Sequence, residues 1–558
     1  MRETTIYAAG TARPTGLRGR VWRATAALLG MATLMMAPAR AAPPTAAQLF
    51  REPAFSQGQL SPDGQKVAVL VSGGAEARRS LVVVDLETLK PVVVGSFKGR
   101  DVDWHQWVND NRLVFRLNWE LVGPGRAAEG PGLYAANADG ESFRALVANS
   151  RSFLSNSDEG NLLDAHTGVY HVSGLSADGS IVVGRPREVS RERVGYHELL
   201  SLNTNSGRTT DVASPVRATH WVFGAGNLPV AALSEVDGKA AWDLHQRDGS
   251  WKRLREFDPL ADGGVSPVWQ APDGRLFGTG TFKGFRALYT LDPASGEPAA
   301  QPLLAVDGFD LSQPQFVVHG QKLLGVRFMA DALATHWFDD DARAVQQELD
   351  RRLPGTANHL QFPRHGASPW VLVTAVSDAQ PASTLAYNRQ TRRLVRVGTT
   401  LPGLDPQALG RTRFERVPAR DGLPIPVYLT LPPGGGTKLP LVVLVHGGPW
   451  ARGANWAFSP EVQFLASRGY AVLQPEFRGS TGFGDRHFRA SFGEWGRAMQ
   501  DDVTDATRWA IAQGVADPAR VCIAGASYGG YATLMGLVRE PALYRCGIDW
   551  VGVTDPDL

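Results

Sequence analysis

Residues 521–538 read VCIAGASYGGYATLMGLV and decide the fold of the last part of the chain. The apolar run 521–524 predicts a buried strand, and the apolar spacing over 528–539 predicts an amphipathic helix. A glycine-rich turn with Ser527 at its centre separates the two. A strand, a tight serine-bearing turn and a helix in this order are typical of the nucleophile elbow of α/β-hydrolases.

The turn requires glycines for a steric reason. Gly525 lies two residues before Ser527, and Gly529 and Gly530 follow it. The turn is so tight that side chains there would collide with the neighbouring strand or helix. Ser527 also stands at a helix N-terminus, where backbone N–H groups favour developing negative charge. We therefore predict Ser527 as a catalytic nucleophile, rather than a helix-capping serine in a plain strand–helix connection.

A second motif supplies the other half of an acyl-transfer site. Residues 445–449 read VHGGP and directly follow the apolar run LVVL. In this fold, one oxyanion donor is the backbone N–H after the nucleophile, here Tyr528, and the other comes from a loop after an earlier strand. We predict Gly448 for that second donor; the alternative is an ordinary Gly-Pro turn.

The surrounding pattern from Phe414 onward indicates an α/β domain. A hairpin with its turn at Asp421 and Gly422 comes first, and apolar runs then alternate with helix-length amphipathic stretches. Such alternation predicts parallel strands joined by crossover helices. The expected strands are 439–445, 470–473, 521–524 and 546–553, and the expected helices are 461–468, 501–513 and 528–539.

The preceding region, residues 45–404, indicates a β-propeller. The phrase SPDG at 61–64 returns as SADG at 176–179 and APDG at 271–274, each time just before an apolar strand. Glycine in such turns supplies a positive φ. At roughly 50 residues per blade, this region predicts about seven blades. The alternative is a generic all-β sandwich.

Four motifs together carry a family resemblance. They are the HGGP loop, FRGSTGFG at 477–484, the DDV helix start at 501–503 and the elbow GASYGGYA at 525–532. In this order they resemble the prolyl oligopeptidase family of serine peptidases, especially its dipeptidyl and acylaminoacyl peptidase branches. The resemblance covers residues 414–555. It implies Ser527 as nucleophile, oxyanion N–H groups on Tyr528 and Gly448, and a propeller that restricts access to short or unfolded peptides.

The chain departs from that family in its catalytic triad. The triad order in this fold is Ser, Asp, His, yet no histidine lies among the 31 residues after Ser527, and His446 and His487 precede it. Asp549, Asp555 and Asp557 come too early for the acid. We therefore expect the triad Asp and His to be absent and residues 414–558 to be the N-terminal portion of a truncated catalytic domain, from a fragment or a truncated reading frame. A serine without a base is a poor nucleophile, so this chain should be nearly inactive.

Three functions are compatible with these patterns. The first is a serine-type peptidase that hydrolyses oligopeptides through an acyl-enzyme on Ser527. The second is a carboxylesterase, which uses the same elbow. The third is a non-catalytic propeller binding protein with a vestigial hydrolase segment. The large propeller favours peptide substrates, because such a lid suits the selection of polymers by length.

Composition excludes several other classes. The chain has 558 residues, too many for one core, and 57 basic against 55 acidic residues, which does not suggest nucleic acid binding. No metal-binding or phosphate-binding motif occurs, so we expect neither metal nor cofactor. Its only cysteines, Cys522 and Cys546, lie in apolar stretches, and their pairing is left open. The oligomeric state and the residue preferred at the cleavage site are open as well.

The N-terminus predicts export. Five arginines precede the apolar run ATAALLGMATLMMA at 24–37, and small residues flank Arg40 in Ala-Arg-Ala. These are the three parts of a secretory signal peptide, here residues 1–41, cleaved after Ala41. The apolar run is shorter than the roughly 20 residues that span a bilayer. We expect a periplasmic or secreted protein with no membrane association after cleavage.

Overall fold

The computed structural model describes residues 42–73, 78–118, 120–123, 126–149, 162–190, 193–215, 217–224, 226–236, 238–258 and 264–555. The expected signal peptide, residues 1–41, lies outside these ranges. Within them, no helix is long and apolar enough to cross a membrane. A short helix, α1 (Ala46–Leu49), opens the described part.

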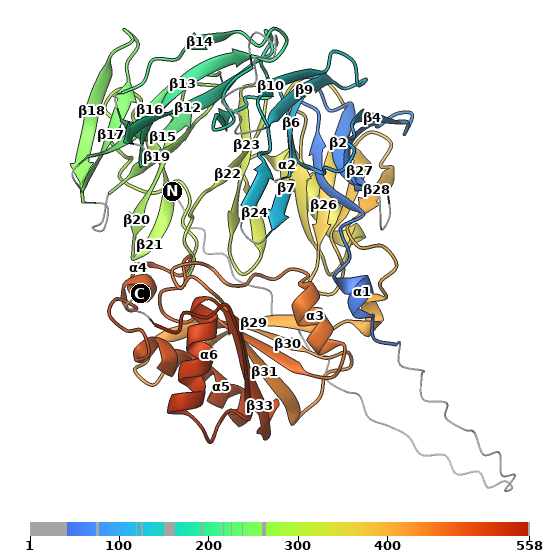
Figure 1. Cartoon of the computed structure of the whole chain (residues 1–558), viewed down its shortest axis with the longest axis vertical. Coiled ribbons are helices and arrows are strands. Elements are labelled where there is room, and N and C mark those ends of the chain that lie inside the picture. The colour runs from blue at the N-terminus through green and yellow to red at the C-terminus, as the bar shows by residue number, and fades with distance from the viewer. Residues whose placement is uncertain are drawn as a thin grey trace, which may run out of the picture. The chain divides into compact units, whose positions relative to one another are not determined.

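Seven antiparallel sheets follow one another along the chain, each built from consecutive strands of one segment (Figure 1). These are the blades of a propeller, which confirms the predicted architecture. Blade 2 also carries a small hairpin, β7 (Glu120–Gly123) and β8 (Arg126–Glu129). The strands are, for blade 1, β1 (Phe55–Leu60), β2 (Lys66–Ser72), β3 (Arg79–Asp85) and β4 (Pro91–Gly95); for blade 2, β5 (Val102–Trp107), β6 (Arg112–Leu117), β9 (Leu133–Asn137) and β10 (Arg144–Val147); for blade 3, β11 (Gly168–His171), β12 (Ser180–Ser190), β13 (Arg193–Asn203) and β14 (Thr209–Asp211); for blade 4, β15 (Ala218–Phe223), β16 (Pro229–Val236), β17 (Lys239–His245) and β18 (Trp251–Phe257); for blade 5, β19 (Ser266–Gln270), β20 (Leu276–Phe282) and β21 (Phe285–Leu291); for blade 6, β22 (Gln315–His319), β23 (Lys322–Met329) and β24 (Leu333–Trp337); and for blade 7, β25 (Ala357–Gln361), β26 (Trp370–Val376), β27 (Ser383–Asn388) and β28 (Leu394–Thr399).

The repeated turn motif (SPDG, SADG and APDG) lies where the sequence predicts it, before the second strand of blades 1, 3 and 5. Gly64, Gly179 and Gly274 all have φ between 73° and 88°. In the first copy, Ser61 Oγ donates a hydrogen bond to Asp63 Oδ1 at 2.6 Å. The small polar side chains therefore close the turn while glycine supplies the left-handed backbone.

The propeller is closed without a covalent or shared-strand link. The N–H of Ala54 donates to Thr400 O at 2.9 Å, and Ser368 Oγ donates to Gly64 O at 2.6 Å. Between blades 1 and 7, apolar side chains from facing sheets pack into a shared core, such as Leu60 and Val69 with Leu372. Apolar packing between blades and these few hydrogen bonds therefore join blade 7 to blade 1.

One helix interrupts the propeller where only strands were expected. Helix α2 (Asp340–Arg352) lies between blades 6 and 7, and it buries Ala342 and Leu349. Asp339 caps it by accepting the N–H of Ala342 at 2.7 Å. The capping aspartate, acidic first turn and basic last turn are helix signals that the strand-based prediction overlooked.

Buried histidines give the propeller a pH-dependent stability. Burial lowers the pKa of His105, His171 and His359 to about 4, from about 6.5 in an unfolded chain. Between pH 6.5 and 4 the unfolded chain therefore binds more protons, and stability falls as the pH drops, by about 1.4 kcal/mol per pH unit for each histidine. Urea denaturation from pH 7.5 to 5 measures this slope, and His105→Gln should reduce it. A stability that is flat or rises on acidification would contradict the prediction.

The C-terminal region forms a six-stranded sheet in the order β29-β30-β32-β31-β33-β34 (Figure 1). β31 pairs in parallel with β32 and β33, and β33 with β34, as expected for crossover connections. The strands are β29 (Arg411–Pro418), β30 (Pro424–Leu431), β31 (Leu439–Val445), β32 (Ala471–Pro475), β33 (Ala516–Ala526) and β34 (Cys546–Trp550); the helices are the 3-10 turn η1 (Pro406–Ala408), α3 (Pro460–Ala466), α4 (Asp485–Arg489), α5 (Ala498–Ala512) and α6 (Tyr528–Arg539).

These elements match the predicted strands and helices to within a few residues, apart from longer N-terminal ends on β33 and α5. The predicted hairpin turn at Asp421 and Gly422 joins β29 to β30, and Gly422 has φ 81°. Cys522 and Cys546 are cross-strand partners on β33 and β34 and form a disulfide. All five residues of β34 are exposed, including the apolar Ile548 and Trp550.

Candidate active site

Ser527 occupies a strained turn between β33 and α6. Its backbone has φ 56° and ψ −121°, a region that L-residues other than glycine rarely adopt. The Ser527 N–H donates to Trp550 O at 3.3 Å, and Ser527 O accepts from Tyr531 N at 3.1 Å. Its side chain is exposed and makes no hydrogen bond to the described residues. The fold thus holds the backbone rigidly and leaves Oγ accessible.

The elbow glycines are required by contacts with the neighbouring strand. A Cβ on Gly525 would lie 2.6 Å from Val445 O, and a Cβ on Gly529 would lie 2.1 Å from the same oxygen. A Cβ on Gly530 would lie 2.1 Å from Asp549 Oδ1 on β34. The first two contacts involve backbone, which cannot turn aside, so α6 packs against β31 only because these positions lack side chains.

This packing gives a prediction for Gly529→Ala. The new methyl group must push α6 away from β31, so we expect a loss of about 1–3 kcal/mol in the free energy of unfolding and a displaced Ser527. Chemical denaturation measures the loss. Gly226→Ala is the matched control, because a Cβ added at Gly226 would have nothing within 4 Å, and it should cost less than about 1 kcal/mol. Equal stabilities for the two variants would contradict the steric explanation.

The loop after β31 lies directly behind Ser527. A Cβ on Gly447 would lie 3.3 Å from Ser527 Cβ and 3.9 Å from its Oγ. Gly448 has φ 128°, and its N–H donates no hydrogen bond to the described residues. The Tyr528 N–H is the first of α6 and has no partner within the helix. The two predicted oxyanion donors are therefore free, on segments that border Ser527.

Buried polar groups hold this loop in place. The Glu476 carboxylate is buried after β32 and accepts N–H groups from Gly453 at 3.0 Å and Ala454 at 2.5 Å. His446 Nδ1 lies 2.7 Å from Gly447 O, so it donates there, and Nε2 then accepts from Ser480 Oγ at 2.9 Å. The ring of His446 also stacks on Phe477. The segment around Gly448 is thus anchored at both ends.

A buried ion pair supports the 477–484 segment. Arg478 Nε and Nη2 each donate to the Asp502 carboxylate at 2.8 Å, and Arg478 N donates to the same group at 2.8 Å. Arg478 Nη2 also lies 2.9 Å from Asp421 Oδ2 on the hairpin turn. The hydrogen bonds that Arg478 donates to Asp502 raise the pKa of the Arg478 guanidinium above its usual range. This pair joins the segment, α5 and the β29–β30 hairpin.

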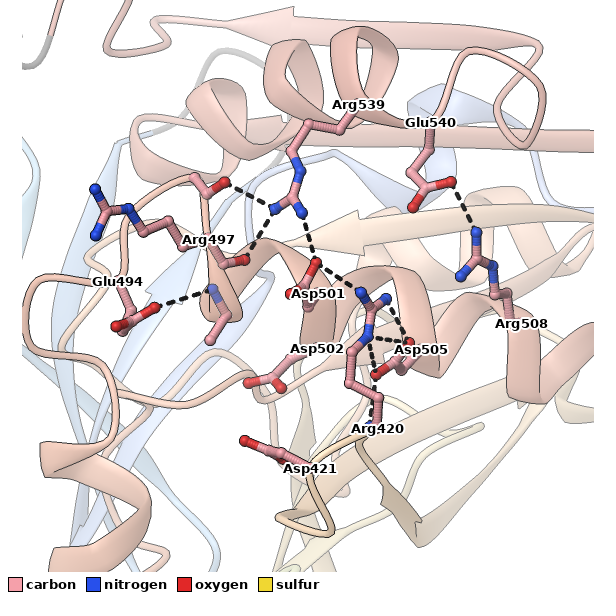
Figure 2. A network of polar contacts seen from close by, with 12 residues as sticks. Arg420, Asp421, Glu494, Arg497, Asp501, Asp502, Asp505, Arg508, Arg539 and Glu540 are labelled. Carbon is pink, nitrogen blue, oxygen red and sulfur yellow. Dashed lines mark hydrogen bonds and ion pairs between the residues drawn. The ribbon is translucent and has the colours of Figure 1, made fainter.

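A second, more exposed network lies beside it (Figure 2). Arg420 on the hairpin contacts Asp505 at 2.8 Å and Asp501 at 3.1 Å, both on α5. Arg539, at the end of α6, contacts Asp501 at 2.8 Å and donates to the carbonyl oxygens of residues 496 and 497. The helix that follows the elbow is therefore tied to α5 at its far end.

Neither histidine of the hydrolase segment is placed to activate Ser527. His446 Nε2 is occupied by Ser480, and His487 is buried with Nε2 3.0 Å from Phe477 O. Burial lowers the pKa of His487 to about 4, so it is neutral near pH 7. Among the described residues, no imidazole contacts Ser527 Oγ.

The structure thus brings together every residue that the sequence singled out for the site: Gly448, Gly525, Ser527, Tyr528, Gly529 and Gly530. Sequence reasoning missed the supporting residue Glu476, and it placed Arg478 and Asp502 in family motifs without giving them a role. The sequence gives only a weak signal for these residues. Each is a charged residue inside or beside an apolar run, and such a position does not show which residue is its partner. No group of His, Cys, Asp and Glu in the described part of the chain is arranged to hold a metal.

The fold and this site define a serine-bearing α/β-hydrolase segment preceded by a seven-bladed propeller. Residues 456–558 match the model of the prolyl oligopeptidase family.

Individual relatives agree with this assignment. Dipeptidyl aminopeptidase BIII of Pseudoxanthomonas mexicana is 32% identical over 400 residues, which are 68% of this chain and 56% of that protein. Dipeptidyl peptidase family member 6 of Caenorhabditis elegans is 39% identical over 207 residues, 33% of this chain and 28% of that protein. The chain thus spans about half the length of the first relative and less of the second.

A solved structure shows the same fold. The puromycin-hydrolyzing peptidase of Mycobacterium tuberculosis superposes with a TM-score of 0.63 at 19% identity, and the alignment covers 92% of this chain and 80% of that one.

Proposed function

We propose that this chain carries the nucleophile and oxyanion site of a serine peptidase that acts on oligopeptides. One observation carries the proposal: Ser527 is exposed on a strained elbow next to the free N–H groups of Tyr528 and Gly448. Ser527 Oγ attacks the peptide carbonyl, and the two N–H groups stabilise the resulting oxyanion. The amine leaves with a proton, and water then hydrolyses the acyl-enzyme.

Residues 1–558 alone should acylate slowly. The attack requires a base that takes the proton of Ser527 Oγ, and no described imidazole contacts that atom. Oxyanion stabilisation and binding without the base retain only a small part of the catalysis of a complete triad. Acceleration by added imidazole, which supplies a base from solution, would support this account.

Peptides are favoured over simple esters as substrates. The support comes from the names of the relatives, which are peptidases, and from the propeller, whose size suits selection by length. A carboxylesterase uses the same elbow and is the second candidate. A propeller that only binds peptides is the third.

Mass spectrometry of the acyl-enzyme separates these candidates. The protein is incubated with a peptide p-nitrophenyl ester and with p-nitrophenyl acetate, an acetyl ester with the same leaving group, and the adduct on Ser527 is timed. Faster acylation by the peptide supports the peptidase, and faster acylation by the acetyl ester supports the esterase. The absence of any adduct with either reagent, in the presence of imidazole, would leave only the binding protein.

We also propose that the protein is exported and works in an oxidising compartment. The arginine-rich start and apolar run of residues 1–41 support export, and the Cys522–Cys546 disulfide is stable under such conditions. Sequencing the N-terminus of the mature protein tests this: a chain that begins at Ala42 agrees, and one that retains residues 1–41 does not.

A further inference from the structure

The propeller contains a cavity of about 250 Å³ at its centre. Residues on or just after the first strands of blades 1, 2, 3, 6 and 7 line it, together with Arg327 on β23. The cavity belongs to the propeller alone and is separate from the elbow at Ser527. Its polar lining consists of Gln59, Gln106, Ser173, Gln315, Arg327, Gln361 and Arg364.

Two arginines in this lining lack an acidic partner. No lining residue is a carboxylate, and neither Arg327 nor Arg364 forms an ion pair with any residue that the structure describes. Arg327 Nη2 donates to Leu360 O at 2.7 Å. Arg364 Nε is buried and has no hydrogen-bond partner among the described residues. Burial lowers the pKa of both guanidinium groups, and no neighbouring carboxylate offsets this effect.

Two of the glutamines around the cavity are already engaged. Gln59 Nε2 donates to His105 O at 3.1 Å, and Gln361 bonds to the backbone of blade 1 at Gly58 and Leu60. These bonds join the first strands of adjacent blades and hold the walls in place. The nearby His171, whose pKa burial lowers to about 4, is neutral near pH 7 and adds no positive charge to the cavity.

A partly buried guanidinium without a counter-ion is costly, because burial removes water from the charge without replacing all of its hydrogen bonds. A carboxylate offers planar, paired oxygens that match the guanidinium donors. The cavity is cationic, and its volume of about 250 Å³ suits a ligand somewhat smaller than a typical drug-sized molecule. We propose that it is a carboxylate-binding site, which takes the C-terminal carboxylate of a short peptide or a free small dicarboxylate. The assignment rests on the propeller and does not depend on the chemistry proposed for Ser527.

Isothermal titration calorimetry of the Ser527→Ala protein tests the site without interference from hydrolysis. The probes are triglycine, triglycine amide and succinate, at low ionic strength because salt screens such contacts. Triglycine should bind about tenfold or more tightly than its amide, since charge-assisted hydrogen bonds are lost with the carboxylate. Tighter binding of triglycine than succinate assigns the site to peptides, and the reverse order assigns it to free dicarboxylates.

Variants connect the binding to the arginines. Arg364→Gln and, separately, Arg327→Gln should each weaken triglycine binding by about tenfold. The control is Arg396→Gln, an exposed arginine on β28, which should leave binding unchanged. Circular dichroism confirms that each variant is folded. If Arg327→Gln does not fold, Arg364→Gln alone tests the proposal. Equal binding of triglycine and its amide, full binding by Arg364→Gln, or no binding of any probe would overturn the proposal. Loss of acylation at Ser527 with intact triglycine binding would count against the peptidase and not against this site.

Discussion

Replacing Ser527 with alanine should abolish covalent labelling of the protein by a fluorophosphonate. The reagent requires a nucleophilic oxygen beside oxyanion donors, and Ser527 is placed next to the free N–H groups of Tyr528 and Gly448. Loss of a nucleophile lowers acylation by at least about a thousandfold in enzymes of this type. Labelling is followed by intact mass, and the modified residue is located by peptide mapping, with imidazole present as base.

Two comparisons make this result specific. Ser295→Ala removes an exposed serine from a propeller turn and should leave labelling unchanged. Ser527→Ala itself should fold normally, because the Ser527 side chain makes no hydrogen bond to described residues. A label that persists in Ser527→Ala, or that maps to another residue in the unchanged protein, would refute Ser527 as the nucleophile.

Replacing Asp502 with alanine should destabilise the hydrolase segment by about 3–5 kcal/mol. Asp502 is buried, and so is most of Arg478, so the substitution leaves a buried guanidinium without its main counter-ion. The partly exposed Asp421 remains, but it meets only one nitrogen of Arg478. Hydrogen exchange of α5 peptides during denaturation measures this loss separately from the propeller.

The neighbouring network provides the matched control (Figure 2). Arg420→Ala breaks contacts to Asp501 and Asp505, but the Arg420 side chain is 44% exposed. Exposed pairs contribute about 0–1 kcal/mol, so Arg420→Ala should cost less than about 1 kcal/mol. Asp502→Leu combined with Arg478→Met should recover most of the stability, because it removes both buried charges. A loss in Arg420→Ala equal to that in Asp502→Ala would contradict this explanation.

Local sequence patterns were sufficient for the elements of the hydrolase segment. β31 and α6 begin and end at the predicted residues, because an apolar run bounded by glycine and an amphipathic stretch after a turn are short-range signals. The blade turns at Gly64, Gly179 and Gly274 were predicted for the same reason. Helix α2 was missed although Asp339 marks its start, because the surrounding strands outweighed that local signal.

The sequence by itself determined the propeller, the α/β order, the elbow and the residues around Ser527. The elbow, the blade turns and each strand or helix depend on residues within a few positions of one another, so periodicity and glycine spacing reveal them. The propeller and Gly448 were predicted because such local motifs recur along the chain or follow an earlier strand. Only the tertiary structure decided which distant groups meet: Glu476 with the loop at Gly453, Arg478 with Asp502, and Cys522 with Cys546. It also placed Arg327 and Arg364 in one cavity without a carboxylate. Such contacts depend on how sheets and helices that are tens or hundreds of residues apart in the sequence pack together. A local sequence pattern does not predict which of these residues meet.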